Sequence, residues 1–252
     1  MGPVLAVLFA ASRTIYLVHG GAELRPGADN GHAGTSSLID HPVSIPAWET
    51  TEATWQATVD CVRDMYAPFA VTVTDEDPGD APHITAIFGG SPTLMGQPRS
   101  LAGVSPFKSD CGVIESSVVF AFTDILPADP HAVCNVIAQE IAHSYGLDHE
   151  LLDSDPMTTT HTTMDRAFAD EDVACGETSA RPCGYAGSTC RATQNSFTLL
   201  KDRLGLAGQD ETDTEEASAG GCNVNGHGDG MILLIAAFAL RGLNAARTRR
   251  QR

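Results

Sequence analysis

The stretch from Asp129 to His149 constrains the fold of this chain more than any other part of the sequence. Asp129 is suited to cap a helix, and Pro130 is suited to its first position. Gly146 can end the helix, because glycine adopts the left-handed conformation at little cost. The sequence therefore predicts a core-facing helix that stops in a sharp turn. Its apolar stripe consists of Val133, Val136, Ile137 and Ile141.

The same helix carries polar side chains that are expected to meet at one point. Gln139 and His143 are four residues apart and project from one face, with Glu140 beside them. A continuous helix would carry His149 almost two turns beyond His143. A sharp turn at Gly146 would instead bring His149 back toward the other side chains. We therefore expect Gln139, Glu140, His143 and His149 to converge.

This pattern, followed by Met157, resembles the zinc-binding segment of the metzincin peptidases. The family motif reads H-E-x-x-H-x-x-G-x-x-H, and Gln139 here stands in place of its first histidine. The gap from His149 to Met157 is similar to that of the matrixin branch, whose methionine forms a turn beneath the metal. The resemblance implies Zn²⁺ held by His143, His149 and, as a weaker neutral donor, Gln139.

The resemblance also implies an endopeptidase that acts on extracellular proteins. Zinc would lower the pKa of a bound water, and Glu140 would take its proton as general base and pass it to the leaving amine. The protein or peptide substrate would lie along an edge strand, expected at residues 117–122. His131 and His161 are alternative ligands, although solvated surface histidines are the simpler interpretation. The alternative function is a catalytically inactive surface protein with a binding or adhesion role.

Periodicity along the rest of the chain favours an α+β fold, and the resemblance implies a metzincin-like one. A twisted mixed sheet would pack on the active-site helix, followed by an irregular, disulfide-containing C-terminal subdomain. Loop or irregular structure is expected over residues 20–47, 89–111 and 150–192. Helices are expected at 51–67 and 196–204, and strands at 69–74, 84–88 and 117–122.

Cysteine and charge content bound the cellular setting. Six of the seven cysteines lie between residues 61 and 190 and could form three disulfides, which suits an exported protein; reduced core cysteines are the alternative. A formal net charge of −17 disfavours nucleic-acid binding. The chain is expected to be a monomer. A structural Ca²⁺ site is a weaker expectation, because the spacing of its residues fits no EF-hand. Those residues are Asp165, Asp170, Glu171 and Asp172.

Residues 13–207 are interpreted as one catalytic domain, flanked by processing segments. Residues 1–12 indicate a truncated signal segment, or else they begin a buried strand. Residues 208–221 have the composition of a flexible acidic linker. Residues 222–252 hold Cys222, a short apolar run and an arginine cluster, and resemble the sorting tails of myxobacterial surface proteins. That resemblance implies processing near Cys222, earlier membrane contact through the tail, and a location at the cell surface, in the outer envelope or outside the cell. A disordered or amphipathic tail is the alternative.

Overall fold

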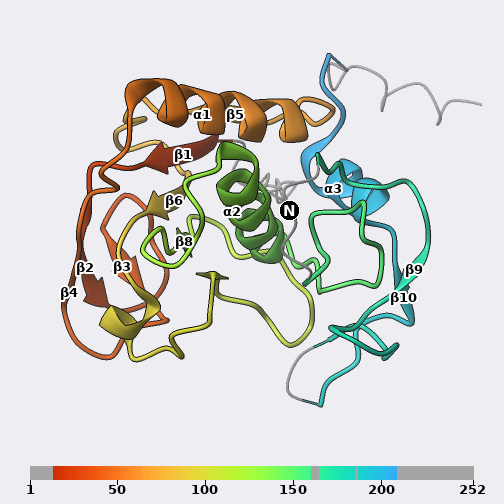
Figure 1. Ribbon diagram of the computed structural model, residues 1–252. Helices are drawn as coiled ribbons and strands as arrows, with labels where there is room; N and C mark the ends of the chain where they lie inside the picture. The colour runs from red at the N-terminus through yellow and green to blue at the C-terminus, as the bar shows by residue number, and fades with distance from the viewer. Residues whose placement is uncertain (1–13, 160–164, 185–186, 209–252) are drawn as a thin grey trace, which may run out of the picture. The chain divides into compact units, whose positions relative to one another are not determined.

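The computed structural model describes residues 14–159, 165–184 and 187–208, which lie in one compact unit (Figure 1). The expected signal segment, the linker from residue 209 onward, the tail with Cys222, and His161 lie outside the described residues. Among the described residues, no helix is long and apolar enough to cross a membrane. This part of the chain is an α+β structure with a mixed sheet and three α-helices.

A five-stranded sheet in the order β5-β1-β6-β8-β7 forms the centre of the fold. β1 pairs in parallel with β5 and β6, β6 pairs in parallel with β8, and β7 runs antiparallel to β8. Every residue of β6 and β8 is buried, as expected for strands that are covered on both faces. The expected mixed sheet is therefore confirmed. Its strands are β1 (Thr14–Val18), β5 (Thr72–Thr74), β6 (Ile84–Phe88), β7 (Gly103–Val104) and β8 (Val118–Ala121).

The edge of this sheet differs from the sequence prediction. Residues 117–122 are predicted to be an edge strand, whereas β8 lies between β6 and β7. The edge strand is β7, inside the segment 89–111 that composition predicts to be loop. That segment also holds the 3-10 helix η1 (Pro92–Met95). β7 is two residues long and includes a glycine, so it lacks the alternation that identifies a strand.

A second, three-stranded sheet covers one face of the main sheet. β2 (Ala22–Pro26) pairs in parallel with β3 (Thr35–Ser36) and antiparallel with β4 (Val43–Ile45). The prediction of loop for residues 20–47 is therefore wrong. The small sheet is stabilised by apolar contact with the main sheet, which composition alone does not reveal. The packed side chains are Leu24, Val43 and Ile45 against Ile87, Val118 and Phe120.

Helices α1 (Glu52–Tyr66) and α2 (Pro130–Ser144) pack on each other and on the main sheet (Figure 1). Thr51 caps α1 by accepting from the amide of Thr54, and Asp129 caps α2, as predicted. The predicted apolar stripe of α2 and one apolar face of α1 are buried in the main core. The apolar face and the cap together fix the entry and orientation of α2, which carries the candidate site.

The described residues contain three disulfides, which confirms the prediction of three bridges. One links α1 to α2, and the other two lie around the irregular C-terminal part. That part contains two short strands and a final helix capped by Asn195. The elements are β9 (Val173–Ala174), β10 (Thr193–Gln194) and α3 (Ser196–Leu204). The disulfides are Cys61–Cys134, Cys111–Cys190 and Cys175–Cys183.

Helix α2 ends in a turn that only glycine fits. Gly146 has a φ of 77°, and its amide donates to the carbonyl of His143 at 2.8 Å. A Cβ at this position would overlap the carbonyl oxygen of Cys111. The turn is therefore held both by its backbone conformation and by the loop that the Cys111–Cys190 disulfide anchors.

Replacing Gly146 by alanine is expected to destabilise the fold more than a left-handed conformation alone would. Gly96→Ala is the matched control, because Gly96 has a φ of 69° and a Cβ there would meet nothing within 4 Å. We expect a loss of about 1–2 kcal/mol for Gly96→Ala and on the order of 3–4 kcal/mol for Gly146→Ala. Denaturant unfolding with the disulfides intact measures both. Equal losses would show that the contact with Cys111 contributes nothing.

Candidate metal centre

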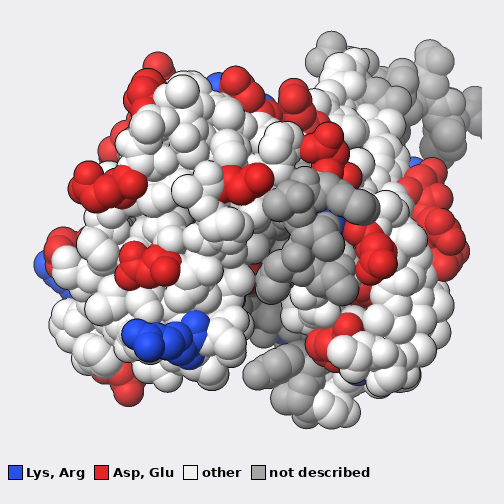
Figure 2. Space-filling model, viewed as in Figure 1, with Lys and Arg blue, Asp and Glu red and all other residues white. Residues whose placement is uncertain are grey.

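Four side chains predicted to converge do line one cavity, whose volume is about 850 Å³. Gln139, Glu140 and His143 reach it from α2, and His149 reaches it from the segment after the Gly146 turn. Other parts of the wall include β7 and the segment between the two cysteines of the Cys175–Cys183 disulfide. On the face drawn in Figure 2, acidic side chains are widespread and Lys and Arg are sparse. A negative field of this kind favours the approach of cations.

The two histidines face each other across a short gap. Their Nε2 atoms are 3.1 Å apart. Tetrahedral zinc with Zn–N distances of about 2.0–2.1 Å would hold two ligand nitrogens roughly 3.3 Å apart. The observed separation is therefore close to that of two nitrogens sharing one metal ion.

The other ring nitrogens define the tautomers of these histidines. His143 Nδ1 lies 2.6 Å from the carbonyl oxygen of Leu147, and His149 Nδ1 lies 3.4 Å from Glu177 Oε1, a long hydrogen bond. The Leu147 carbonyl only accepts, so His143 Nδ1 carries the hydrogen and His143 Nε2 presents a lone pair, and the Glu177 carboxylate favours the same tautomer of His149. Burial is the main cause that lowers the pKa of His143 to about 3, and the neighbouring His149 contributes in the same direction. Two lone pairs that face each other at this distance need a cation or a proton between them.

Gln139 is tied to the turn that contains Met157. Its Nε2 donates to the carbonyl oxygens of Pro156 at 2.8 Å and Thr158 at 2.7 Å. Both amide hydrogens are then committed, and Oε1 is the atom that remains to bind a cation. Met157 itself is fully buried in the main core, next in sequence to both carbonyls. Sequence reasoning did not anticipate this link between α2 and the methionine turn.

Glu140 is buried against the edge strand. Only 5% of its surface is exposed, and burial raises its pKa to about 8, with the Ser105 hydroxyl acting in the opposite direction. Gly103 in β7 makes room for it, since a Cβ there would lie 2.6 Å from Glu140 Oε1. The carboxyl group can therefore take up or release a proton near neutral pH.

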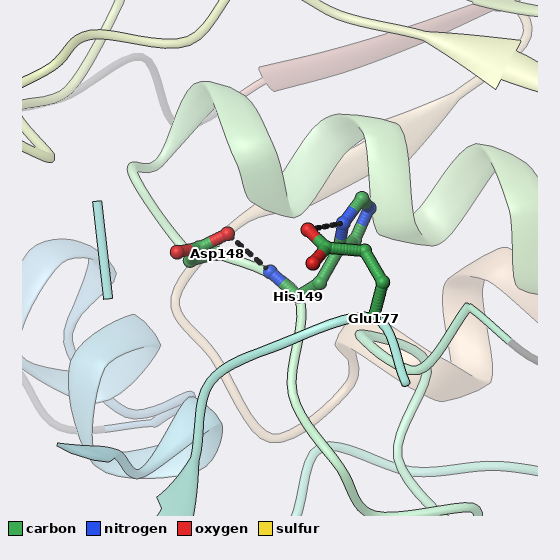
Figure 3. A group of neighbouring side chains, drawn as sticks. All are labelled: Asp148, His149 and Glu177. Carbon is green, nitrogen blue, oxygen red and sulfur yellow. Dashed lines mark hydrogen bonds and ion pairs between the residues drawn. The ribbon is translucent and has the colours of Figure 1, made fainter. Parts of the chain in front are cut away.

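His149 also belongs to a second group of possible metal ligands, together with Asp148 and Glu177 (Figure 3). Their candidate ligand atoms lie within 4.8 Å of one another. Asp148, however, is already paired with Arg181, at 2.5 and 3.0 Å, and accepts from the amide of Gly184. Burial opposes ionisation, yet these bonds hold the pKa of Asp148 below its usual value. This carboxylate is thus satisfied by the protein, which makes Asp148 a poor candidate for a metal ligand.

The other predicted ligands that the structure describes do not line the cavity. His131 lies on the surface, paired with Asp165 at 2.8 Å. Asp170 accepts hydrogen bonds from Asn195 and Thr198 instead. Within the described ranges, the structure does not gather the four acidic residues expected for Ca²⁺.

Glu177 and Arg181 were missed by sequence reasoning. Both line the cavity, and they lie between Cys175 and Cys183, whose close spacing was their only signal in the sequence.

No protein-family model matches the chain, and no curated protein matches it. The interpretation of the site therefore depends on its own residues and geometry.

Replacing Gly103 by alanine is expected to displace the Glu140 carboxyl group. The new Cβ would also lie 2.8 Å from the carbonyl oxygen of Phe120, so we expect destabilisation of about 1–3 kcal/mol. Gly20→Ala is the control, because a Cβ at Gly20 meets nothing within 4 Å. It should change stability by no more than about 0.5 kcal/mol.

A double-mutant cycle identifies the residue that Gly103→Ala disturbs. Glu140→Ala removes the overlapping carboxyl group, so it should offset part of the loss caused by Gly103→Ala. Denaturant unfolding of the two single variants and the double variant measures the coupling. Additive effects, within about 0.5 kcal/mol, would mean that Gly103 does not accommodate Glu140.

Proposed function

We propose that this chain is a zinc-dependent endopeptidase of metzincin type. The observation that carries the proposal is the pair of Nε2 atoms of His143 and His149, 3.1 Å apart, with an acceptor oxygen beside each Nδ1 atom. This is the arrangement of histidines that share a metal, with the second nitrogen held by a carbonyl or a carboxylate. Gln139 Oε1 would be the third ligand from the protein.

The described fold supports the proposal without identifying the family. α2 packs beside the sheet and points its polar face at a cavity that is bounded by an antiparallel edge strand. Met157 is buried, and the residues on either side of it are hydrogen-bonded to Gln139 of this face. A helix, a glycine turn, a third ligand and a buried methionine turn thus occur in the order that the resemblance implies.

Glu140 is suited to act as the general base. Zinc, when bound, supplies a water of lowered pKa and polarises the carbonyl of the peptide bond. A carboxyl group whose pKa is about 8 can accept a proton and return it near neutral pH, which is the requirement for general acid-base catalysis. A nearby cation would lower this pKa and favour the charged form, which a general base needs. Glu140 would pass the proton to the departing amine.

The edge strand offers a place for an extended substrate. β7 pairs with β8 on one side only among the described strands, and Gly103, Val104 and Ser105 line the cavity beside Glu140. A peptide can add to such an edge through main-chain hydrogen bonds. The substrate strand is thus proposed at β7, in place of the strand at residues 117–122.

The disulfides support an extracellular or exported protein, because such bridges persist in oxidising environments. Anchoring at the cell envelope through the tail, with processing near Cys222, remains a proposal of its own.

The alternative of an inactive surface protein is favoured by one observation. The two hydrogen bonds from Gln139 give this residue a structural role that needs no metal.

Metal content and peptide cleavage test the proposed function. We expect one zinc per chain and cleavage within a broad peptide library. Glu140→Ala should retain zinc and lose about 10²–10⁴-fold in kcat/KM, the usual contribution of a general base. Elemental analysis and mass spectrometry of the products measure the two properties. Equal cleavage by parent and Glu140→Ala, or a parent without zinc at micromolar free metal, would contradict the proposal.

Gln139→His tests the unusual ligand. An imidazole is a stronger zinc donor than an amide, so zinc should bind more tightly, as measured by competition with a chelator. A neutral imidazole also carries a single N–H, which must serve the two carbonyl oxygens that Gln139 now satisfies. The metal-free variant should therefore lose about 1–3 kcal/mol in denaturant unfolding. Unchanged zinc affinity would mean that another residue already supplies the third ligand.

A further inference from the structure

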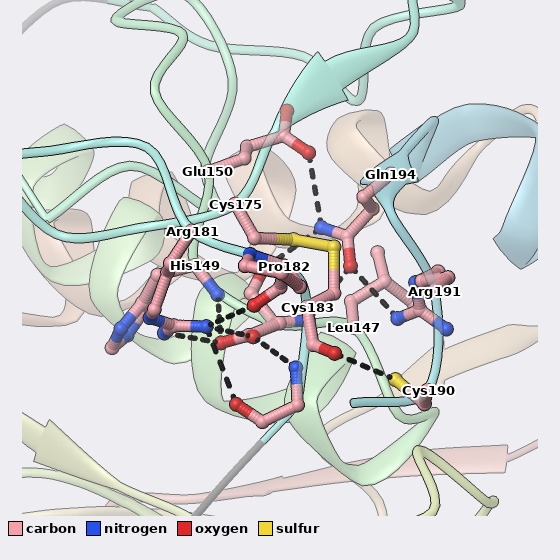
Figure 4. The surroundings of a disulfide bond; sticks show 12 residues. Leu147, His149, Glu150, Cys175, Arg181, Pro182, Cys183, Cys190, Arg191 and Gln194 are labelled. Carbon is pink, nitrogen blue, oxygen red and sulfur yellow. Dashed lines mark hydrogen bonds and ion pairs between the residues drawn. A yellow bond between two sulfur atoms is a disulfide. The ribbon is translucent and has the colours of Figure 1, made fainter. Parts of the chain in front are cut away.

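The segment from Cys175 to Cys183 is folded against the backbone of His149. A disulfide closes this segment, and both cysteines are fully buried (Figure 4). The amide of Gly176 donates to the carbonyl oxygen of His149 at 3.0 Å, and Cys175 also bridges to Glu150. This segment is called here the Cys175–Cys183 loop. It is therefore hydrogen-bonded to the backbone segment that presents His149 to the cavity.

Arg181 in this loop joins two carboxylates that both contact His149. Its guanidinium binds Asp148 at 2.5 and 3.0 Å and Glu177 Oε1 at 2.6 Å. Asp148 accepts from the His149 amide at 2.7 Å, and Glu177 lies 3.4 Å from His149 Nδ1 (Figure 3). The four residues form a closed ring of interactions that fixes the backbone and the imidazole of His149 together.

We propose that the Cys175–Cys183 loop positions His149 for metal binding, with Glu177 as the residue that holds its imidazole. This inference rests on the proposed zinc site. Glu177 acts through His149: its oxygen contacts Nδ1, whereas Nε2 faces His143. Both Glu177 oxygens also accept from Arg181, at 2.6 and 3.3 Å. Glu177 is thus a positioning residue.

The two histidines differ in how their rings are held, and the difference explains why the loop is needed. His143 Nδ1 has the carbonyl oxygen of Leu147, four residues away, as its acceptor. His149 lies beyond the helix, and its acceptor comes from 28 residues further along the chain. The disulfide between cysteines eight positions apart restricts the conformations of the loop and so helps to keep Glu177 next to His149 Nδ1. The ion pair of Glu177 with Arg181 alone is half-exposed and contributes little to stability.

Zinc affinity is the first test, with Glu177→Ala and Glu177→Gln as variants. Asp75→Asn is the matched control, because Asp75 also pairs with an arginine, Arg63, at 3.0 Å but does not line the cavity. Loss of such an acceptor typically weakens metal binding about 10–100-fold. We expect that loss for Glu177→Ala, partial recovery for Glu177→Gln, whose amide oxygen still accepts, and no change for the control. Glu177→Ala within twofold of the control would overturn the proposal.

The tautomer of His149 in metal-free protein is the second test, and it needs no zinc. Long-range ¹H–¹⁵N NMR of the imidazoles should show the hydrogen on Nδ1 of His149 in the parent. Glu177→Ala should shift the population toward the Nε2–H tautomer, while the unfolding midpoint stays close to that of Asp75→Asn. An unchanged tautomer would overturn the role of Glu177. If the parent binds no zinc, the proposed function fails. The effect of Glu177→Ala on the His149 tautomer then decides by itself whether the loop positions His149.

Discussion

The sharp turn at Gly146 is the constraint on which the candidate site depends. It lets the chain leave α2 and return His149 to within 3.1 Å of His143, measured between the Nε2 atoms. The carbonyl oxygen of Cys111 occupies the space that a side chain would need. A residue without a side chain therefore couples three features: the end of the helix, the loop held by the Cys111–Cys190 disulfide, and the geometry of the two histidines.

The features that the sequence predicted are those with local causes. The cap at Asp129 acts within three residues, and the buried stripe of α2 follows from the helical period. Convergence of Gln139, Glu140, His143 and His149 also follows from local geometry, since one helix and one turn carry all four. The number of disulfides was predictable from the count of cysteines.

The features that were missed depend on contacts between distant segments. The strands β2 to β4 are short, and only their packing on the main sheet gives them a buried side. β7 is identified as the edge strand by its pairing with β8, not by its own two residues. Glu177 reaches His149 because of a disulfide pairing that the sequence left open. Each of these belongs to the cavity wall or supports it, so the sequence located the centre of the site but not its surroundings.

Gln139 gives up strength as a zinc ligand but gains hydrogen bonds to the turn that contains Met157. A histidine would give a stronger donor to zinc, but with one nitrogen on the metal it would keep a single N–H. Glutamine gives a weaker oxygen donor together with two N–H groups, which bind the carbonyls on both sides of Met157. A buried carbonyl that loses its donor costs about 1–3 kcal/mol, which is comparable to a tenfold change in metal affinity. The residue that weakens the proposed zinc site therefore also stabilises the turn beneath it, and selection on the fold alone could retain it.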